Sequence, residues 1–297
     1  MEITIKRMHE CTMEEVLESW NKGWEGYYFN MTMGYDQYFA RMASEGLSIP
    51  LSLIAFAEGK PAGFLLNGIR NLDGKKVGWN GGTAVSPEYR RHGVGRKLME
   101  AALDVYREEG CDMAILEAMS QNDRAIALYE QYGYETIDRL LLYVCESFGE
   151  GTFGLRDETP YAVRAVPLSE AGNLPFYKHW AAWQTHWLSD RGNGEALVVE
   201  DEEGNVVGYA LCRRFYSLDG QLLAVVLTQC ETLPDHPDAD TILATALRDV
   251  FGPASARCRR STLNLSAKHE RLLRLLEQEG FKERDSQVYM LRGMEKE

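Results

Sequence analysis

The sequence lacks several features that would assign it to a familiar class. No run of about 18 apolar residues occurs, so we expect no membrane-spanning helix and no membrane partner. The opening segment, MEITIKRMHE, has no apolar core of a secretory signal. The six cysteines are scattered without a CxxC pair, which gives no zinc site and suits free thiols in a reducing compartment. The sequence therefore predicts a cytoplasmic protein with no metal.

Basic residues are also scarce. The chain has 32 Lys and Arg against 45 Asp and Glu, for a net charge of −13. Binding to duplex nucleic acid requires a basic face, so nucleic acid is not an expected partner. What is present is an ordinary globular composition, 45% hydrophobic and 26% charged over 297 residues, which is long enough for two domains.

The chain consists of two similar halves. The segment at 128–134, LYEQYGY, resembles the segment at 275–281, LLEQEGF, with an offset of 275 − 128 = 147 residues. The same offset maps Pro87 onto Pro234 and Leu116 onto Leu263. A constant offset at separated places indicates a duplicated domain. We predict domains at 1–147 and 160–297, joined by a linker at 148–159 that is rich in glycine and charge.

Hydrophobic periodicity predicts an α+β fold, in which helices flank a mixed sheet in each half. Strands are expected in the first half at 51–59, 61–70, 75–85 and 113–118, and helices at 12–46, 93–109 and 122–132. The order is repeated in the second half, where helices are expected at 169–190, 239–251 and 267–279.

One segment combines glycines with basic residues directly before a helix. Residues 83–97 read TAVSPEYRRHGVGRK, in which a strand ends at Val85 and an amphipathic helix follows Gly95. A helix N-terminus offers unpaired N–H groups and a partial positive charge, and glycines allow a phosphate to approach the backbone. The cluster of Lys and Arg reverses the sign of an acidic chain locally. The segment therefore predicts a phosphate cradle, with a basic helix cap as the alternative interpretation.

This arrangement resembles the GNAT family of acyl-CoA-dependent N-acetyltransferases. The first matching motif is Arg90-x-x-Gly93-x-Gly95, between a strand and a helix. The second is Asn122 followed by Tyr129 in QNDRAIALYEQYGYE, on a later helix. The resemblance covers 1–145 in detail and 160–297 in layout only.

The resemblance implies that acetyl-CoA lies between two splayed strands that end near Val85 and Glu117. Backbone groups of three residues would pair with the pantetheine arm, and the N–H of Val85 would serve as the oxyanion donor. N–H groups of the loop would hold the pyrophosphate, and Asn122 would lie near the pantetheine. The cofactor-binding residues expected on this basis are Thr83, Ala84, Val85, Arg90, Arg91, His92, Gly93, Val94, Gly95, Arg96 and Asn122.

Two residues are the catalytic candidates. The family motif implies that Tyr129 protonates the departing thiolate, although by periodicity alone it reads as a core tyrosine. Glu117 ends an apolar strand, where it is either the base for the amine or an exposed strand-end carboxylate. No cysteine stands in a nucleophile motif, so direct attack in a ternary complex is expected.

Aromatic residues accumulate from Trp20 to Phe39, where the family builds its acceptor pocket; core packing explains them equally well. The second half has lost the motif. The 147-residue offset maps Gly93 onto Asp240, Tyr129 onto Leu276 and Glu117 onto Asn264. Like charges repel a pyrophosphate, so the C-terminal copy is expected to be degenerate and to serve the first half structurally. An independent activity with another ligand stays open.

The resemblance implies transfer of an acetyl group from acetyl-CoA to a primary amine of a small molecule or a protein. One alternative is a protein N-terminal or lysine acetyltransferase. Another is transfer from aminoacyl-tRNA, which the intact loop and acidic composition oppose. A third is a non-catalytic CoA-binding sensor or scaffold. A homo-oligomer is compatible with the sequence.

Overall fold

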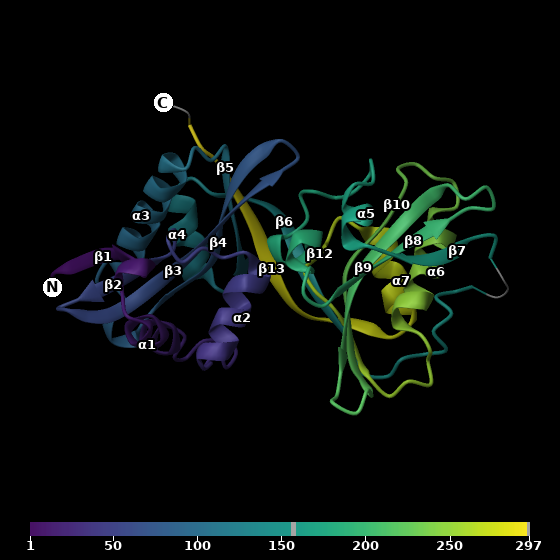
Figure 1. Cartoon of the computed structure of the whole chain (residues 1–297), viewed down its shortest axis with the longest axis horizontal. Helices are drawn as coiled ribbons and strands as arrows, with labels where there is room; N and C mark the ends of the chain where they lie inside the picture. The colour runs from purple at the N-terminus through teal and green to yellow at the C-terminus, as the bar shows by residue number, and fades with distance from the viewer. Residues whose placement is uncertain (156–158, 296–297) are drawn as a thin grey trace. The chain divides into compact units, whose positions relative to one another are not determined.

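The computed structural model describes residues 1–155 and 159–295. The chain divides into two compact units, whose elements are labelled in Figure 1. Unit 1 is Met1–Ile137 with the stretch from Tyr289 onward, and unit 2 is Asp138–Val288. The backbone therefore passes between the units twice, inside β6 (Glu135–Cys145) and inside β13 (Phe281–Gly293).

These units are bounded differently from the predicted ranges, because the closing strand of each half contributes to the other unit. In unit 1, the N–H of Met294 donates to the carbonyl of Asp112 at 2.9 Å. In unit 2, the Arg139 guanidinium donates to the hydroxyl of Ser286 at 3.1 Å. Alternation along a strand shows which face is buried but does not specify the neighbouring strand, so the sequence could not predict this exchange.

Unit 1 is built on a mixed sheet. Its first strands, β1 (Ile3–Arg7), β2 (Leu53–Ala57), β3 (Lys60–Leu72) and β4 (Lys75–Val85), are antiparallel neighbours, and β5 (Met113–Met119) adds in parallel. Tight turns join β2 to β3 and β3 to β4. Residues 58–59 and 73–74 adopt positive φ, which matches the twist of the strands that they join.

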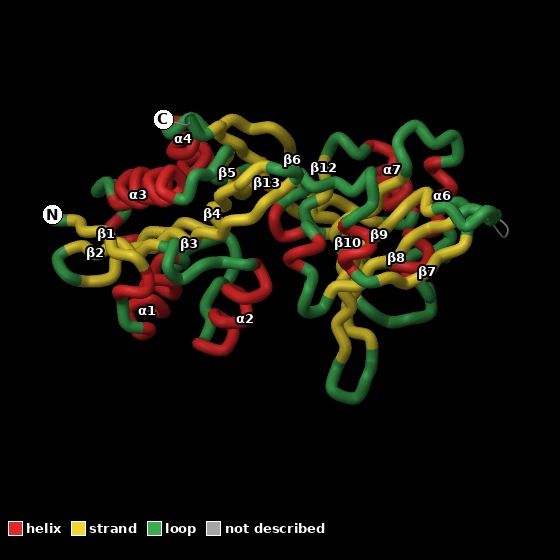
Figure 2. Tube along the Cα trace, turned by 45° about the horizontal axis from the view of Figure 1, so that its top comes forward, coloured by secondary structure: helices red, strands yellow, loops and turns green. Residues whose placement is uncertain are grey.

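The helices of unit 1 cover both faces of this sheet. Figure 2 shows α1 (Met13–Gly23) and α2 (Tyr35–Glu45) on one face, and α3 (Val94–Glu108) and α4 (Asp123–Gln131) on the other. The predicted helix over 12–46 is therefore two helices. Gly26 lies between them with a φ of +72°, a conformation that a continuing helix does not allow.

Unit 2 repeats the mixed sheet. Its strands are β7 (Ala162–Val166), β8 (Gly194–Glu200), β9 (Val206–Tyr216), β10 (Leu222–Thr232), β11 (Arg259–Thr262) and β12 (Leu265–Ser266). The pairs β7–β8, β8–β9 and β9–β10 are antiparallel, and β10–β11 is parallel. The α+β fold class is thereby confirmed in both units.

Alternation along β8 separates the two cores of unit 2. Leu197 and Val199 face α6 (Ala239–Phe251) and α7 (Glu270–Gln278). Ala196 and Val198 face the opposite side, which the segment after β7 covers. The predicted helices at 239–251 and 267–279 are confirmed with small changes at their ends.

The predicted helix over 169–190 is wrong. Only α5 (Leu168–Gly172) is α-helical there, followed by 3-10 turns at Trp183–Thr185 and Trp187–Ser189. Pro175 follows α5 and cannot donate the backbone hydrogen bond that a continuing helix needs. The aromatic residues are core residues of an irregular segment, since Tyr177 and Trp183 are buried.

The predicted linker at 148–159 is partly packed on unit 2. Phe153 is only 1% exposed, and Phe148 and Phe153 contact the ring of Phe251. The Glu279 carboxylate accepts hydrogen bonds from the N–H groups of Gly151 and Phe153 at 3.0 and 2.8 Å. Residues 156–158 lie outside the described residues. No helix in the part of the chain that the structure describes is long and apolar enough to cross a membrane.

Candidate active site

The site of unit 1 lies where strands β4 and β5 separate. Their parallel ladder runs from Val77–Met113 to Asn80–Leu116 and ends there. The register between β3 and β4 shifts at the same place, with Gly81 as the extra residue. A bulge of this kind bends the strand, so the segment 81–85 leaves β5 and opens the sheet. This splay is the one that the family resemblance implied.

A cavity of about 750 Å³ occupies this opening. It lies between the end of β4, the N-terminus of α3, helix α4 and the segment after α1. It is lined by Gly23, Trp24, Gly26, Tyr27, Tyr28, Thr83, Ala84, Val85, Tyr89, Arg90, Arg91, Gly93, Val94, Gly95, Arg96, Asn122, Arg124, Ala125, Ala127, Leu128, Tyr129 and Gln131. Every predicted cofactor-binding residue except His92 is therefore part of this lining.

The N-terminus of α3 opens into the cavity. The N–H of Lys97 donates to the carbonyl of Gly93 at 3.1 Å, which leaves the N–H groups at 94–96 ahead of the first α-helical bond. Gly93 has a φ of +88°, which favours glycine. A Cβ at Gly95 would lie 3.4 Å from Leu128, an ordinary contact. A small side chain therefore fits there, whereas a large one would fill the space in front of the N–H groups.

Positive charge surrounds this helix terminus. Arg91, Arg96 and Arg124 are exposed and form no ion pair with a described residue. Three unpaired guanidinium groups at one cavity of a chain with net charge −13 create a local field for an anion. Arg124 was not predicted from the sequence. Its position two residues after Asn122, within the second motif, could have indicated that it lies at the same cavity.

Arg90 has a different function from its neighbours. Its Nε donates to the carbonyl of Val85 at 2.9 Å, and its Nη2 donates to the carbonyls of Glu25 and Gly23 at 2.7 and 3.4 Å. The side chain thus holds the end of α1 against the end of β4, where the cavity walls meet. Because its donors are used inside the protein, Arg90 supports the cavity more than it supplies charge to a ligand.

Tyr129 extends from α4 into the cavity wall and is 6% exposed. Burial raises the pKa of its phenol to about 12, and a hydrogen bond with the Thr83 side chain opposes this shift. The Thr83 hydroxyl in turn donates to Oδ1 of Asn80 at 3.0 Å. The ring also packs against Tyr134, with centroids 6.2 Å apart. The phenol is therefore protonated at neutral pH and held in one position.

Aromatic side chains form the opposite wall. The ring centroids of Trp24 and Tyr27 lie 4.4 Å apart, and Tyr28 packs edge-on against Tyr27 at 5.0 Å. The indole N–H of Trp24 is buried and has no hydrogen-bond partner among the described residues. Burial raises the pKa of Tyr27 to about 12. This wall lies within the predicted aromatic run.

Of the remaining predicted residues, Glu117 and His92 do not line the cavity, and Asn122 lines it but also caps a helix. Glu117 does not line the cavity, and its Oε2 accepts a hydrogen bond from the indole N–H of Trp79 at 2.7 Å. Asn122 lines the cavity and caps α4, because its Oδ1 accepts from the N–H of Ala125 at 3.4 Å. His92 is exposed. The catalytic and binding roles of these residues stay predictions.

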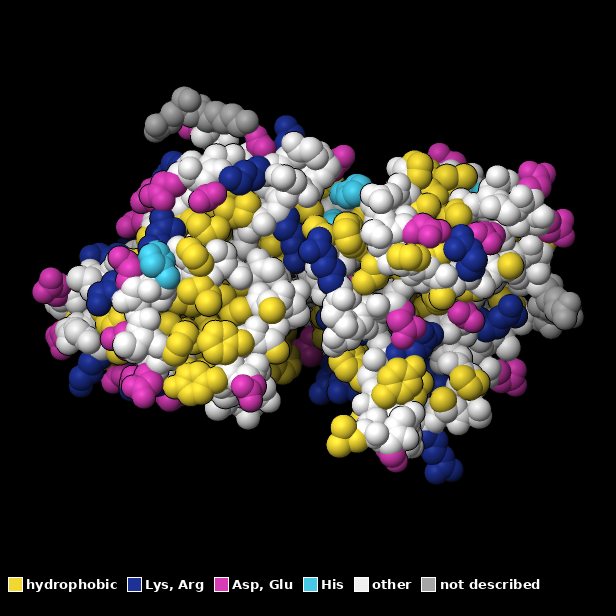
Figure 3. All heavy atoms as spheres, in the orientation of Figure 1, with side chains coloured by type: hydrophobic (Ala, Val, Ile, Leu, Met, Phe, Trp, Pro, Cys, Tyr) yellow, Lys and Arg dark blue, Asp and Glu magenta, His cyan; other side chains and the backbone are white. Residues whose placement is uncertain are grey.

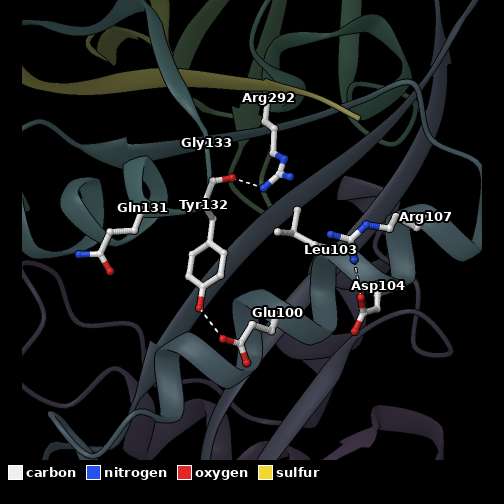
Figure 4. A pocket seen from close by; sticks show the side chains of 8 residues that line it. All are labelled: Glu100, Leu103, Asp104, Arg107, Gln131, Tyr132, Gly133 and Arg292. Atoms are coloured by element: carbon white, nitrogen blue, oxygen red, sulfur yellow. Dashed lines mark hydrogen bonds and ion pairs between the residues drawn. The ribbon is translucent and has the colours of Figure 1, made fainter. Parts of the chain in front are cut away.

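A second cavity of unit 1, of about 580 Å³, lies between α3, the C-terminal end of α4 and β13 (Figure 4). Arg292 of β13 donates a hydrogen bond to the carbonyl of Tyr132, at the C-terminal end of α4. The hydroxyl of Tyr132 donates to Glu100 of α3 at 2.9 Å. These contacts fasten α4, which bears Tyr129, to both α3 and the last strand.

The corresponding positions of unit 2 hold ion pairs. Asp240, which the 147-residue offset aligns with Gly93, lies in the first turn of α6, and its carboxylate receives Nη2 of Arg274 at 2.5 Å. Glu231 and His269 replace Ala84 and Asn122, and their side chains lie 3.4 Å apart. Burial lowers the pKa of His269, but hydrogen bonding and the charge of Glu231 outweigh it, so the pKa is raised overall. In unit 2, ion pairs thus form within the region that corresponds to the cavity-forming region of unit 1.

Comparison with known proteins agrees with this geometry. Residues 7–134 match the acetyltransferase (GNAT) family model. This range contains β4, the α3 loop and α4, which form the cavity of unit 1. The region at 7–134 is thus a GNAT domain.

Curated relatives match over short segments. The chain is 39% identical over 66 residues to N-alpha-acetyltransferase 30 of Saccharomyces cerevisiae, covering 22% of this chain and 38% of that protein. It is 43% identical over 51 residues to the [ribosomal protein bS18]-alanine N-acetyltransferase of Escherichia coli K12, covering 17% and 34%. The chain thus matches only about a third of the length of these two relatives.

Solved structures match over nearly the whole chain. A tandem GNAT protein from the clavulanic acid biosynthesis pathway aligns with a TM-score of 0.67 at 14% identity, covering 99% of both chains. A GCN5-related N-acetyltransferase from Sphaerobacter thermophilus aligns with a TM-score of 0.65 at 14% identity, covering 98% of this chain and 96% of that one. The tandem arrangement of two GNAT folds is thereby confirmed.

Proposed function

We propose that unit 1 transfers an acetyl group from acetyl-CoA to a primary amine by direct attack in a ternary complex. The observation that carries this proposal is the single cavity in which the free N-terminus of α3, the Tyr129 phenol and an aromatic wall meet. The first suits a phosphate, the second suits proton transfer, and the third suits an amine-bearing acceptor.

The described residues fit acetyl-CoA. The N–H groups at 94–96 and the guanidinium groups of Arg91 and Arg96 would hold the pyrophosphate, and Arg124 would add charge at the rim. The edge of β4 at Thr83–Val85, which β5 leaves uncovered, would pair with the pantetheine amides. We assign the oxyanion contact to the N–H of Val85.

When bound, acetyl-CoA supplies the acetyl group as a thioester. Burial raises the pKa of Tyr129 to about 12, so the phenol is protonated at neutral pH. We assign this side chain as the general acid that would deliver its proton to the departing sulfur, because it lines the cavity. The hydrogen bond with Thr83 fixes the position of the phenol oxygen. A thiol ordinarily has a pKa of about 8.5, so its thiolate is a moderate leaving group. A nearby acid assists its departure by protonating the sulfur.

We assign Glu117 an indirect role. Its carboxylate holds the indole of Trp79, which is 1% exposed, and it does not line the cavity. The carboxylate would therefore accept the amine proton only through water. If Glu117→Gln changes kcat less than about tenfold and leaves the pH profile unchanged, then the carboxylate is structural.

Unit 2 is proposed to bind no acetyl-CoA and to serve unit 1 structurally. The Asp240–Arg274 pair lies in the first turn of α6, where its carboxylate opposes an anion at the helix N-terminus, and the Glu231–His269 pair lies beyond the end of the β10–β11 ladder. The structural role belongs to the C-terminal half of the chain, whose residues from Tyr289 onward are part of unit 1.

The main alternative is a protein N-terminal or lysine acetyltransferase. The names of the two curated relatives, an N-alpha-acetyltransferase and a ribosomal-protein alanine N-acetyltransferase, favour a protein acceptor over a small molecule. A non-catalytic CoA sensor is the second alternative. It predicts binding without turnover, so a thiol-release assay over a panel of amines distinguishes it from an enzyme.

Calorimetry of the cradle tests the proposal. Gly95→Trp should abolish acetyl-CoA binding, because the indole fills the space in front of the helix N-terminus. Gly95→Ala is the matched control and should bind nearly as wild type, since a Cβ there makes only ordinary contacts. Wild type should bind one acetyl-CoA per chain. Unchanged affinity in Gly95→Trp, or a stoichiometry of two, would refute the assignment.

A further inference from the structure

The segment between α1 and α2 is uncharged and displays large aromatic rings. Between Glu25 and Asp36 the sequence reads GYYFNMTMGY, ten residues without a charge in a chain that is 26% charged. Four rings of this region are each more than 40% exposed: Tyr28, Phe29, Tyr35 and Phe39. We call these four residues the aromatic face. Figure 3 shows hydrophobic side chains gathered over α1 and the segment that leads to α2.

This segment is fixed in place by α1. The indole N–H of Trp20 donates to the carbonyl of Met31 at 2.7 Å. The amide of Asn21 forms two hydrogen bonds with the backbone of Met33, at 3.1 and 3.2 Å. Because buried or half-buried side chains hold the backbone on the inner side, the rings are turned outward by the fold itself. Exposed rings on a fixed backbone form a ready surface for a partner.

The aromatic face meets the active-site cavity at Tyr28. Tyr28 belongs to both, because it lines the cavity and is 47% exposed. Its hydroxyl donates to the carbonyl of Gln121, next to Asn122, at 3.2 Å. Phe29 follows directly and lies 6.4 Å from the ring of Tyr27. An acceptor whose amine enters the cavity beside Tyr27 would therefore lay its remaining part on these rings.

We infer that the aromatic face binds the apolar side chains of a polypeptide acceptor whose N-terminal amine is the group acetylated. The inference rests on the proposed acetyltransferase function and specifies its substrate class. It selects N-termini with large apolar side chains in their first residues, because burying such side chains against aromatic rings is favourable and no charge in the segment offers an ion pair.

The extent of the face favours a polypeptide over a small amine. A small acceptor would be enclosed in the cavity and would not reach Tyr35 and Phe39, which lie on α2 outside it. An extended chain continues beyond the cavity and covers several rings.

The experiment compares two lysine-free peptides that differ only in their first residues, one beginning Leu-Phe and the other Ser-Asp. The variant Phe29→Ser/Phe39→Ser removes two rings that do not line the cavity. Leu218→Ser, on the fully exposed turn of unit 2, is the matched control. Turnover of a short alkylamine reports the basal activity, and thermal unfolding verifies that each variant is folded.

Wild type should prefer the apolar peptide by about tenfold or more in kcat/KM, and the double variant should lose most of that preference. Alkylamine turnover and the KM for acetyl-CoA should not change, and Leu218→Ser should behave as wild type. Equal rates for the two peptides, or an equal effect of Leu218→Ser, overturn the inference. So does a wild-type dimer that the double variant converts to monomers, because the face is then a contact between copies.

The failure of the proposed function looks different. If alkylamines are acetylated and the peptides are not, only the inference on the aromatic face is wrong. If no amine is acetylated, the acetyltransferase proposal fails, and calorimetry of the apolar peptide in the presence of CoA still tests the face. Weaker binding to the double variant than to Leu218→Ser supports it, and equal binding or none refutes it.

Discussion

Arg292 of β13 donates a hydrogen bond to the main-chain carbonyl of Tyr132, at the end of the helix that bears Tyr129. A guanidinium at a helix C-terminus satisfies an orphan carbonyl and opposes the negative end of the helix dipole. The last strand thus completes the domain that contains the cavity.

Arg292→Met should therefore lower kcat by about tenfold with little change in acetyl-CoA affinity, because α4 and its tyrosine lose a fixed position. Arg292→Lys should recover part of the rate. Arg284→Met, an exposed position on the same strand, is the control and should behave as wild type. Steady-state kinetics and calorimetry measure the two effects, and an equal loss of rate in both methionine variants would contradict this role.

Arg90 and Arg91 should separate stability from ligand binding. Arg90→Met removes a charged donor from three carbonyls and should lower the free energy of unfolding by about 1.5–3 kcal/mol. Arg91→Gly should weaken acetyl-CoA binding severalfold while keeping stability, since Arg91 has a φ of +68°, which glycine adopts without strain. Denaturant unfolding and calorimetry test the pair; a stable Arg90→Met protein would show that these bonds contribute little.

Tyr129→Phe should lower kcat by about 10²-fold with a nearly unchanged KM for acetyl-CoA. Because the pKa of Tyr129 is raised to about 12, its proton is retained up to that pH. The kcat/KM of wild type should rise as the acceptor amine deprotonates and then stay level through pH 10. A decline below pH 10 that Tyr129→Phe abolishes would place the pKa of this phenol lower. Tyr27→Phe is the matched control, with a similar raised pKa in the same cavity.

The Glu231–His269 pair predicts how unit 2 responds to pH. The pKa of His269 is raised in the folded state, so its contribution to stability is complete below the ordinary value of about 6.5. That contribution is lost as the pH rises through the folded pKa. Thermal unfolding should give a lower Tm at pH 8.5 than at pH 6, and this difference should be smaller in His269→Gln. A variant with the same pH dependence as wild type would assign the effect to other groups.

Part of this architecture is local and could be predicted from the sequence. The loop with Gly93 and Gly95 lies before α3 because short-range glycine and helix signals specify it, and the turns at 58–59 and 73–74 follow from their own residues. The offset of 147 residues predicted a tandem fold because duplicated sequences keep their hydrophobic pattern. Pro175 was a local signal that the helix after β7 ends early. The helical spacing of the aromatic residues around it suggested a longer helix instead.

Other features depend on which segments meet in space. The motif predicts that the Arg90 side chain binds a phosphate, but its Nη2 donates to the carbonyls of Gly23 and Glu25 at the end of α1. Glu117 reads as a base, but Trp79 binds its carboxylate away from the cavity. The sequence by itself determined the helices α3, α4, α6 and α7, the two tight turns and the glycine loop before α3, since each rests on contacts within a few residues. Only the tertiary structure decided that the residues from Tyr289 onward belong to unit 1, because a strand's alternation fixes its buried face and leaves its neighbour unspecified.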